Sequence, residues 1–334
     1  MSERNQALLA WLAEVIGANG FEMAPASSDA SFRRYWRVTH AGRTTIAMDA
    51  PPQHEDCGRY ADLSRRFRAI GINTPEILAE DRAQGFLLIS DLGNGVYLSH
   101  LREDTADRLY GDALGALLTI QARGPLDGLP VYDAPFLLRE LGLFREWFLE
   151  RHLGLDLSEA DRTMLDGVDA LLVESALEQP QVCVHRDYHS RNLMLTEVGN
   201  PGVLDFQDAV VGPVTYDLVS LLRDCYISWP AEQVTDWALG YQRLARQSGV
   251  IQEESPATFL RWFDLIGLQR HLKVCGIFAR LNIRDGKPHY LDDLPRTLGY
   301  MLEVADRYPE LAGLSALLRL RVLPRMTAAD AAAV

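Results

Sequence analysis

The stretch CVHRDYHSRNLML, residues 183–195, decides how the whole chain is interpreted. It gathers two histidines, two arginines, one aspartate and one asparagine into eight consecutive positions between two apolar runs. Desolvating so many polar groups is costly, so their presence between strand-like segments indicates a chemical task. His185, Asp187 and Asn192 form the pattern H-x-D-x-x-x-x-N, and Asp205 follows 13 residues after Asn192, beyond a second apolar run.

This pattern is typical of the phosphoryl-transfer loop of protein-kinase-like enzymes. Asp187 is predicted to orient an alcohol and accept its proton. Asn192 and Asp205 are predicted to hold Mg²⁺, a hard cation that binds oxygen ligands. His185 is predicted to be a buried, hydrogen-bonded support for the loop.

Two other interpretations of the loop stay open. The segment could be a polar loop that matches the motif by coincidence. Alternatively, His185 and His189 could form a metal pair at i and i+4. That spacing suits a helix, whereas short strands flank this segment, and no H-E-x-x-H pattern supplies a third ligand.

The segment GPVTYDLVSLLRD, residues 212–224, supports the phosphoryl-transfer interpretation. Asp217 is predicted to cap and hold the catalytic loop, although an ordinary helix N-cap would look the same in sequence. Asp208, three residues after Asp205, is either a further metal contact or a solvated side chain.

The composition narrows the possible functions. The chain has 334 residues, 48% of them hydrophobic, and a formal net charge of −13, which argues against binding nucleic acid or an anionic membrane surface. Its four cysteines are far apart and form no C-x-x-C pair, which favours a reducing, cytoplasmic location. We find neither a signal-peptide pattern nor a run of 18 uncharged apolar residues.

The periodicity predicts an α+β chain with a small β-rich N-terminal lobe (1–90), a hinge (91–93) and a larger, mostly helical C-terminal lobe (91–334). The turn Ala41-Gly42 separates two strand-like segments, YWRVT and TTIAM, which predicts a hairpin. Further predicted elements are helices over 4–18, 54–70, 104–122, 136–152, 158–178 and from 214 to about 320, a strand within 85–93, and short apolar runs at 182–184, 193–195 and 202–206, the last two as a hairpin.

Over nearly its whole length, the chain resembles the aminoglycoside phosphotransferase branch of the bilobal kinase-like fold, which also contains choline and homoserine kinases. The segments HRDYHSRNLM, LDFQDAVVGPVTYDLVSLLRDCY and RHLKVCGIFARLNIRDGKPHYLDDLPR most resemble the anomeric sugar kinases of bacterial cell-wall recycling. This resemblance implies transfer of phosphate from ATP, with Mg²⁺, to the C1 hydroxyl of N-acetylmuramate and N-acetylglucosamine. The product would feed UDP-N-acetylmuramate formation in peptidoglycan recycling. No obligate protein partner is expected.

The same resemblance places a nucleotide loop at residues 27–31 and implies nucleotide contacts by Ser28, Asp29 and Ser31. The loop departs from the kinase pattern because it contains no glycine. The resemblance also implies that the stretch Ser90, Asp91 and Leu92 offers backbone groups to adenine.

A second departure concerns the lysine that kinases place on the third strand. The equivalent position here is about Met48, and the only lysines of the chain are Lys273 and Lys287. Arg33 or Arg34 is predicted to reach the phosphates instead, unless both are solvated strand-edge charges. Glu55 is a candidate for the helix glutamate. The missing lysine also leaves open a nucleotide-binding regulator without turnover.

Four arginines are candidates for binding the carboxylate of a muramate-type substrate: Arg191, Arg223, Arg280 and Arg284. Each could instead be a surface or ion-pair arginine. An aminoglycoside or another small alcohol is the alternative substrate, and a cationic one would need an acidic pocket.

Overall fold

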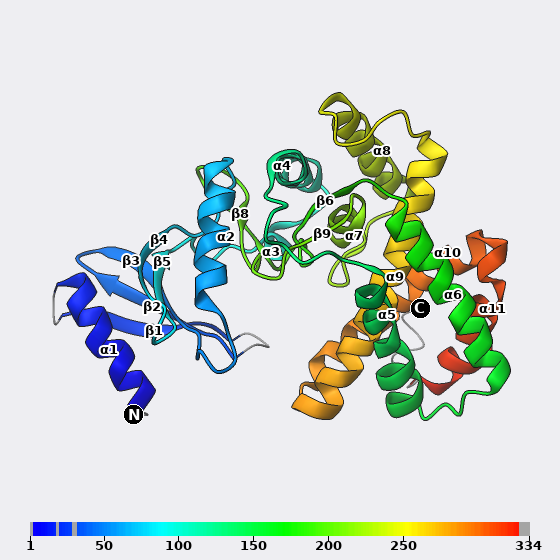
Figure 1. Ribbon diagram of the computed structural model, residues 1–334, viewed down its shortest axis with the longest axis horizontal. Helices are drawn as coiled ribbons and strands as arrows, with labels where there is room; N and C mark the ends of the chain where they lie inside the picture. Colours follow the sequence, from blue (N-terminus) through cyan, green and yellow to red (C-terminus); the bar gives the residue numbers. More distant parts are fainter. Residues whose placement is uncertain (1–2, 18–19, 29–31, 327–334) are drawn as a thin grey trace. The chain divides into compact units, whose positions relative to one another are not determined.

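The computed structural model describes residues 3–17, 20–28 and 32–326 (Figure 1). Its internal contacts divide the chain into two compact units, Met1–Pro125 with Arg191–Asp208 and Leu126–Ser190 with Ala209–Val334. The chain therefore passes from one unit to the other after Pro125, and 191–208 returns to the first. The predicted lobes, 1–90 and 91–334, come from the change in sequence pattern near residue 91 and stay a prediction.

The first unit contains a five-stranded antiparallel sheet with the order β1-β2-β3-β5-β4. Its strands are β1 (Glu22–Ser28), β2 (Arg34–His40), β3 (Arg43–Asp49), β4 (Ile77–Asp81) and β5 (Phe86–Ser90). The predicted hairpin is confirmed as β2 and β3. Its two-residue turn has positive φ at Ala41 (50°) and Gly42 (74°), the conformation that matches the twist of paired strands.

Helices cover this sheet. α1 (Glu3–Ile16) buries Leu8 and Leu12 against Ala47 and Phe86, which confirms the predicted N-terminal helix. α2 (Cys57–Ala69) packs against β4 and β5, and its N-cap Asp56 accepts a hydrogen bond from the Arg59 backbone N–H.

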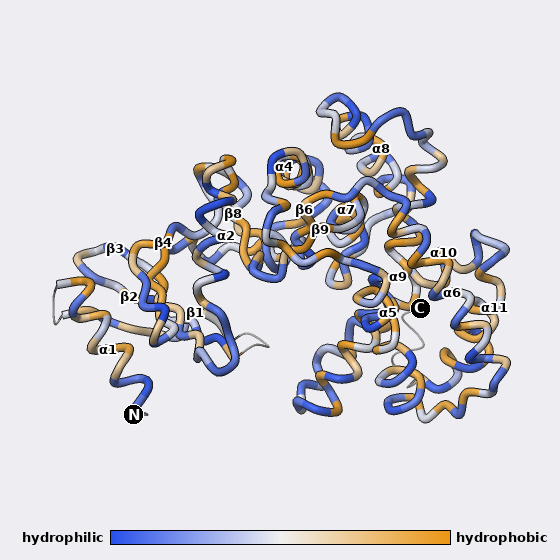
Figure 2. Tube along the Cα trace, in the orientation of Figure 1, coloured by the Kyte–Doolittle hydropathy of each residue, from blue (hydrophilic) through white to orange (hydrophobic). Residues whose placement is uncertain are grey.

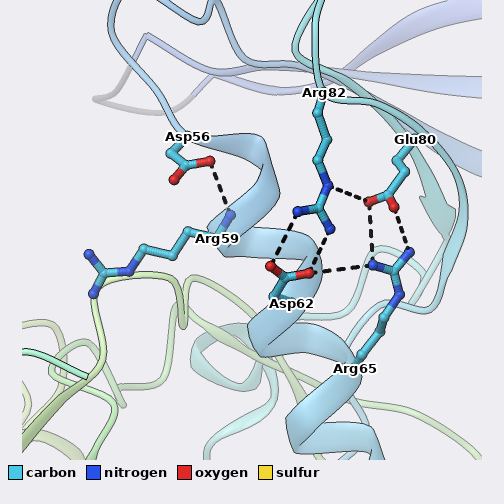
Figure 3. Close-up of polar contacts among 6 residues, drawn as sticks. All are labelled: Asp56, Arg59, Asp62, Arg65, Glu80 and Arg82. Carbon is cyan, nitrogen blue, oxygen red and sulfur yellow. Dashed lines mark hydrogen bonds and ion pairs between the residues drawn. The ribbon is translucent and has the colours of Figure 1, made fainter. Parts of the chain in front are cut away.

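An ion-pair network joins α2 to β4 and to the β4–β5 connection (Figure 3). An Arg82 Nη2 lies 2.6 Å from Asp62 Oδ1, and an Arg65 Nη2 lies 3.2 Å from Glu80 Oε1. These side chains are partly or largely solvent-exposed, so each pair contributes at most about 1 kcal/mol to stability. We assign the network no function.

The remaining elements of the first unit are α3 (Tyr97–His100), α4 (Ala106–Arg123), β7 (Leu193–Met194) and β8 (Gly202–Val203). The predicted short hairpin is confirmed, because β7 and β8 pair antiparallel. α4 carries both hydrophobic and hydrophilic residues (Figure 2), and its predicted apolar face, which includes Leu109 and Leu117, is fully buried.

The second unit is mostly helical. It contains α5 (Ala134–Leu143), a π-helical continuation (Phe144–His152), α6 (Glu159–Leu177), β6 (Gln181–Val184), β9 (Val210–Pro213), α7 (Tyr216–Leu222), α8 (Ala231–Gln247), α9 (Pro256–Asp285), α10 (Leu294–Arg307), α11 (Ala312–Leu317), and shorter turns at Pro288–Asp293, Pro309–Leu311, Leu318–Val322 and Leu323–Arg325. β6 pairs antiparallel with β9 and leads directly into the loop that starts at His185. α9 is buried along much of its length and contributes to the main apolar core. Among the described residues, no helix combines the length and apolar composition needed to cross a membrane.

Gly276 allows α9 to approach the end of α5. A Cβ atom added at Gly276 would lie 2.4 Å from the carbonyl carbon of Leu143, and backbone cannot rotate away as a side chain can. We therefore expect Gly276→Ala to cost about 1–3 kcal/mol of stability and to lower Tm by at least about 3 °C in circular dichroism.

Gly299→Ala, on α10, is the matched control, because nothing lies within 4 Å of its added Cβ. Its Tm should be equal to or slightly above that of the wild type, since alanine is the better helix former. Equal Tm values for the two variants would show that α9 does not closely approach the end of α5.

Candidate active site

The first turn of the loop that follows β6 is held by Asp217. Its carboxylate accepts hydrogen bonds from the backbone N–H groups of His185 (2.6 Å) and Arg186 (2.9 Å). Burial raises the pKa of Asp217 to about 7, although the two N–H groups favour its charged form. His185 is fully buried, as a supporting residue would be. Arg186 has φ of +77°, a conformation that a non-glycine residue keeps only when its surroundings enforce it.

A second carboxylate, which the sequence analysis missed, holds the far end of the loop. Asp224 Oδ2 accepts hydrogen bonds from the backbone N–H (2.9 Å) and the hydroxyl (2.5 Å) of Ser190. Asp224 Oδ1 accepts the N–H of Tyr226 at 3.0 Å. The segment 185–190 is therefore fixed at both ends by buried carboxylates.

Asp187 lies between these two supports and is partly exposed. Burial alone would raise the pKa of Asp187, but the positive charges of Lys273, His189 and Arg186 hold it below its ordinary value. The carboxylate is consequently ionised at neutral pH, the state in which it can accept a proton.

Asn192 and Asp205 are adjacent in the first unit. Asn192 Nδ2 lies 3.4 Å from Asp205 Oδ2, and the backbone N–H of Leu204 donates to the Asn192 carbonyl at 2.9 Å across the short hairpin. Gln207 Nε2 donates to Asp205 Oδ1 at 2.9 Å. Asp208 is exposed. Asp205 has φ of +61°, which turns this residue out of the regular strand geometry.

The side-chain oxygens of Asn192 and Asp205 fit a magnesium ion, because carboxylate and amide oxygens are the ligands that this hard cation prefers. In the part of the chain that the structure describes, no group of three or more His, Cys, Asp or Glu side chains could hold a metal ion alone. Two side chains are a partial set, as is usual for magnesium sites that phosphate oxygens complete.

Arg33 is the cation that lies next to this pair. Its side chain is 8% exposed, with Nη2 3.2 Å from Asp205 Oδ1 and Nε 3.9 Å from Glu55 Oε2. Arg34, the first residue of β2, is exposed, and Met48 is fully buried. A positive charge therefore stands between Glu55 and Asp205, supplied by the residue that directly precedes β2.

The other predicted nucleotide contacts are described only in part. Asp29 and Ser31 lie outside the described residues, as does the side chain of Ser28, whose backbone ends β1. Ser90 Oγ accepts the N–H of Glu76 at 2.8 Å.

Asp91 shapes the segment that contains Leu92. Arg37 donates to Asp91 through Nε (2.6 Å) and Nη2 (3.0 Å), and the N–H of Gly93 donates at 2.9 Å. Burial opposes ionisation, yet these hydrogen bonds keep the pKa of Asp91 below its ordinary value. The Asp91 side chain is thus engaged in fixing its own loop.

The four candidate substrate arginines lie in different surroundings. Arg223 is buried against Asp264 (Nη2 to Oδ1, 2.9 Å), while Arg284 is exposed beside Asp285 (2.8 Å). Arg280 is partly buried on α9, and Arg191 is exposed in the other unit. Asp264 and Arg280 are 16 residues apart on α9, about 24 Å, so one carboxylate cannot contact both Arg223 and Arg280.

Comparison with known proteins gives the family. The model of the phosphotransferase enzyme family matches residues 22–253. The chain belongs to that family. It is an enzyme that transfers a phosphoryl group to an alcohol, as the loop pattern predicted.

Relatives match along most of the chain. The N-acetylmuramate/N-acetylglucosamine kinase of Pseudomonas aeruginosa is 50% identical over 297 residues, which cover 89% of this chain and 88% of that protein. A protein of the same name from Neisseria meningitidis serogroup B is 42% identical over 321 residues, 95% of each chain.

Solved structures show the fold. ADP-bound aminoglycoside phosphotransferase APH(2'')-Ib has a TM-score of 0.58 and 15% identity, with 89% of this chain and 98% of that chain covered. Ethanolamine kinase of Plasmodium vivax has a TM-score of 0.66 and 11% identity, covering 94% and 89%. The predicted α+β, protein-kinase-like fold, with its sheet near the N-terminus and a mostly helical remainder, is confirmed.

Arg33 provides a test of how this phosphotransferase binds nucleotide without the usual lysine. We expect Arg33→Met to weaken ATP binding about 10- to 100-fold in calorimetry, since a hydrogen bond to a charged group is worth about 1.5–3 kcal/mol. Arg33→Lys should retain part of the affinity, because it keeps the charge but loses the guanidinium fork. The control is Arg34→Met, which should bind like the wild type. If Arg33→Met binds ATP with wild-type affinity, Arg33 does not contact the nucleotide.

Proposed function

We propose that this chain is an ATP-dependent amino-sugar kinase that phosphorylates the anomeric C1 hydroxyl of N-acetylmuramate and N-acetylglucosamine. The observation that carries the proposal is the complete set of Asp187, Asn192 and Asp205 in a chain 50% identical to a kinase named for these two sugars. The sugar 1-phosphate is then the substrate of a nucleotidyltransferase that forms a UDP-sugar, which in peptidoglycan recycling is UDP-N-acetylmuramate.

Asp187 acts as the general base of the transfer. Its ionised carboxylate accepts a hydrogen bond from the sugar hydroxyl and takes the proton as the hydroxyl oxygen bonds to the γ-phosphorus. The bond between that phosphorus and the β,γ-bridging oxygen breaks, and ADP leaves. The supports from Asp217 and Asp224 keep the base in place, so little reorganisation is needed during the transfer.

Asn192 and Asp205 would hold Mg²⁺, which when bound supplies charge neutralisation for the triphosphate. Arg33 is placed beside Asp205, where its guanidinium can pair with phosphate oxygens. We expect the stretch Ser90, Asp91 and Leu92 to contact the adenine, and Ser28, Asp29 and Ser31 to line the nucleotide loop. Among the four arginines, one or more is expected to bind the muramate carboxylate.

A coupled ADP-release assay tests the proposal. The acceptors are N-acetylmuramate, N-acetylglucosamine, kanamycin, choline and homoserine, each with ATP and Mg²⁺. We expect turnover with the two amino sugars and none above background with the others. Preference for kanamycin, choline or homoserine would contradict the sugar assignment.

A nucleotide-binding regulator is the second candidate, because Met48 stands where kinases carry a lysine. Nucleotide binding without ADP release, for any of the five acceptors, would favour it over the kinase.

A further inference from the structure

A buried ionic cluster in the second unit touches the catalytic loop from behind. Its charged members are Glu140 on α5, Lys273 on α9 and Arg186 of the loop; Glu140 and Lys273 are each 7% exposed. Lys273 Nζ lies 3.1 Å from Glu140 Oε1 and 3.1 Å from the Tyr216 hydroxyl. Arg186 forms an ion pair with the same Glu140 oxygen.

The cluster is closely hydrogen-bonded around Glu140. The Tyr132 hydroxyl donates to Glu140 Oε2 and accepts from Gln269 Nε2 at 3.3 Å. Glu140 therefore receives donors from α9, from the loop and from the segment that precedes α5. Removing one charge from such a site would leave its partner buried and uncompensated, so each charge of the cluster depends on the others.

The cluster also bears on the catalytic base. Lys273 and Arg186 supply two positive charges against the one negative charge of Glu140, and Asp187 directly follows Arg186. Lys273 contributes to holding the Asp187 carboxylate in its ionised form.

The choice of lysine supports a dedicated role. Arginine provides the fixed positive charge everywhere except at two positions of the chain, and one of them is this buried site. A lysine ammonium is a compact charge that fits between a carboxylate and a phenol, whereas a guanidinium is planar and wider. An apolar residue would fill α9 at lower desolvation cost.

We infer that Lys273 is a positioning residue for phosphoryl transfer: through Glu140 it fixes Arg186, and with it the backbone on which Asp187 stands. The inference rests on the proposed kinase function for its activity readout. Arg186 keeps its positive φ because Asp217 binds its backbone N–H and Glu140 binds its guanidinium. Lys273 keeps Glu140 in position to do so.

Lys273→Met tests the inference with two independent readouts. We expect kcat to fall about 10- to 100-fold with the KM for ATP and sugar within about threefold, because a misplaced base slows chemistry more than binding. We also expect faster amide hydrogen exchange in a peptide that covers residues 183–195. Lys273→Arg should recover part of both.

Two control variants separate positioning from general stability. Lys287→Met removes the other lysine and should leave kcat and exchange unchanged. Arg321→Met breaks a different ion pair, to Asp161 (2.5 Å), and should lower Tm without affecting kcat or the 183–195 peptide.

Unchanged exchange or unchanged kcat in Lys273→Met would overturn the inference, as would an equal loss of kcat in Arg321→Met. If the wild type phosphorylates neither amino sugar, the proposed function fails. Hydrogen exchange then decides whether Lys273 positions the loop.

Discussion

Asp187→Asn is expected to lower kcat for sugar phosphorylation about 10²- to 10⁴-fold, the range that general-base catalysis contributes. The amide has nearly the same shape as the carboxylate but cannot accept the hydroxyl proton. The loop should keep its conformation, because Asp217 and Asp224 hold both of its ends by contacts that do not involve Asp187. ATP affinity in calorimetry should consequently stay within about threefold of wild type.

Asp236→Asn is the matched control for this variant, since Asp236 is an exposed aspartate on α8 with no proposed catalytic or metal-binding role. It should turn over like the wild type. A wild-type rate for Asp187→Asn would show that another group accepts the proton.

Asp205→Ala is expected to remove the magnesium-dependent part of ATP affinity, a loss of about 10- to 100-fold, or roughly 1.4–2.8 kcal/mol. Asp205 supplies the carboxylate of the two predicted ligands, and an amide oxygen alone is a weak site for Mg²⁺. Affinity measured in EDTA should not fall, because the substitution frees Arg33 from its 3.2 Å pair with Asp205. Titrations of ATP with and without Mg²⁺ give both values.

Asp208→Ala resolves the alternative that the sequence leaves open for Asp208. If Asp208 is solvated, this variant shows the wild-type magnesium dependence. If it contacts the metal, part of that dependence is lost. Unchanged magnesium dependence in Asp205→Ala would contradict the metal assignment itself.

Much of the fold could be predicted because its signals are local. The β2–β3 hairpin follows from two β-rich segments around Ala41-Gly42, and α1 and α4 follow from helical periodicity. Three strands were missed. β1 contains Pro25, which is tolerated there because β1 is an edge strand. β4 (ILAED) ends in two acidic residues, and β9 (VVGP) contains glycine and proline, which are residue types depleted in strands.

The candidate site was predictable to the extent that its spacing lies within one motif. The residues that hold the motif were harder to predict, because their partners are distant along the chain. Glu140 is 46 residues from Arg186, and Asp224 is 34 residues from Ser190. The rarity of lysine was the one available signal for Lys273. Sequence could not separate Arg33 from Arg34, since a shift of one residue decides which side chain a strand buries.

Identification of the product is the measurement that tests the central claim most directly. Purified protein is incubated with N-acetylmuramate, ATP and Mg²⁺, and the products are resolved by phosphorus and proton NMR. The account predicts a phosphomonoester whose phosphorus couples to the H1 proton of the sugar, formed in equal amount with ADP. Phosphate on another hydroxyl, or ADP without any sugar phosphate, would contradict it.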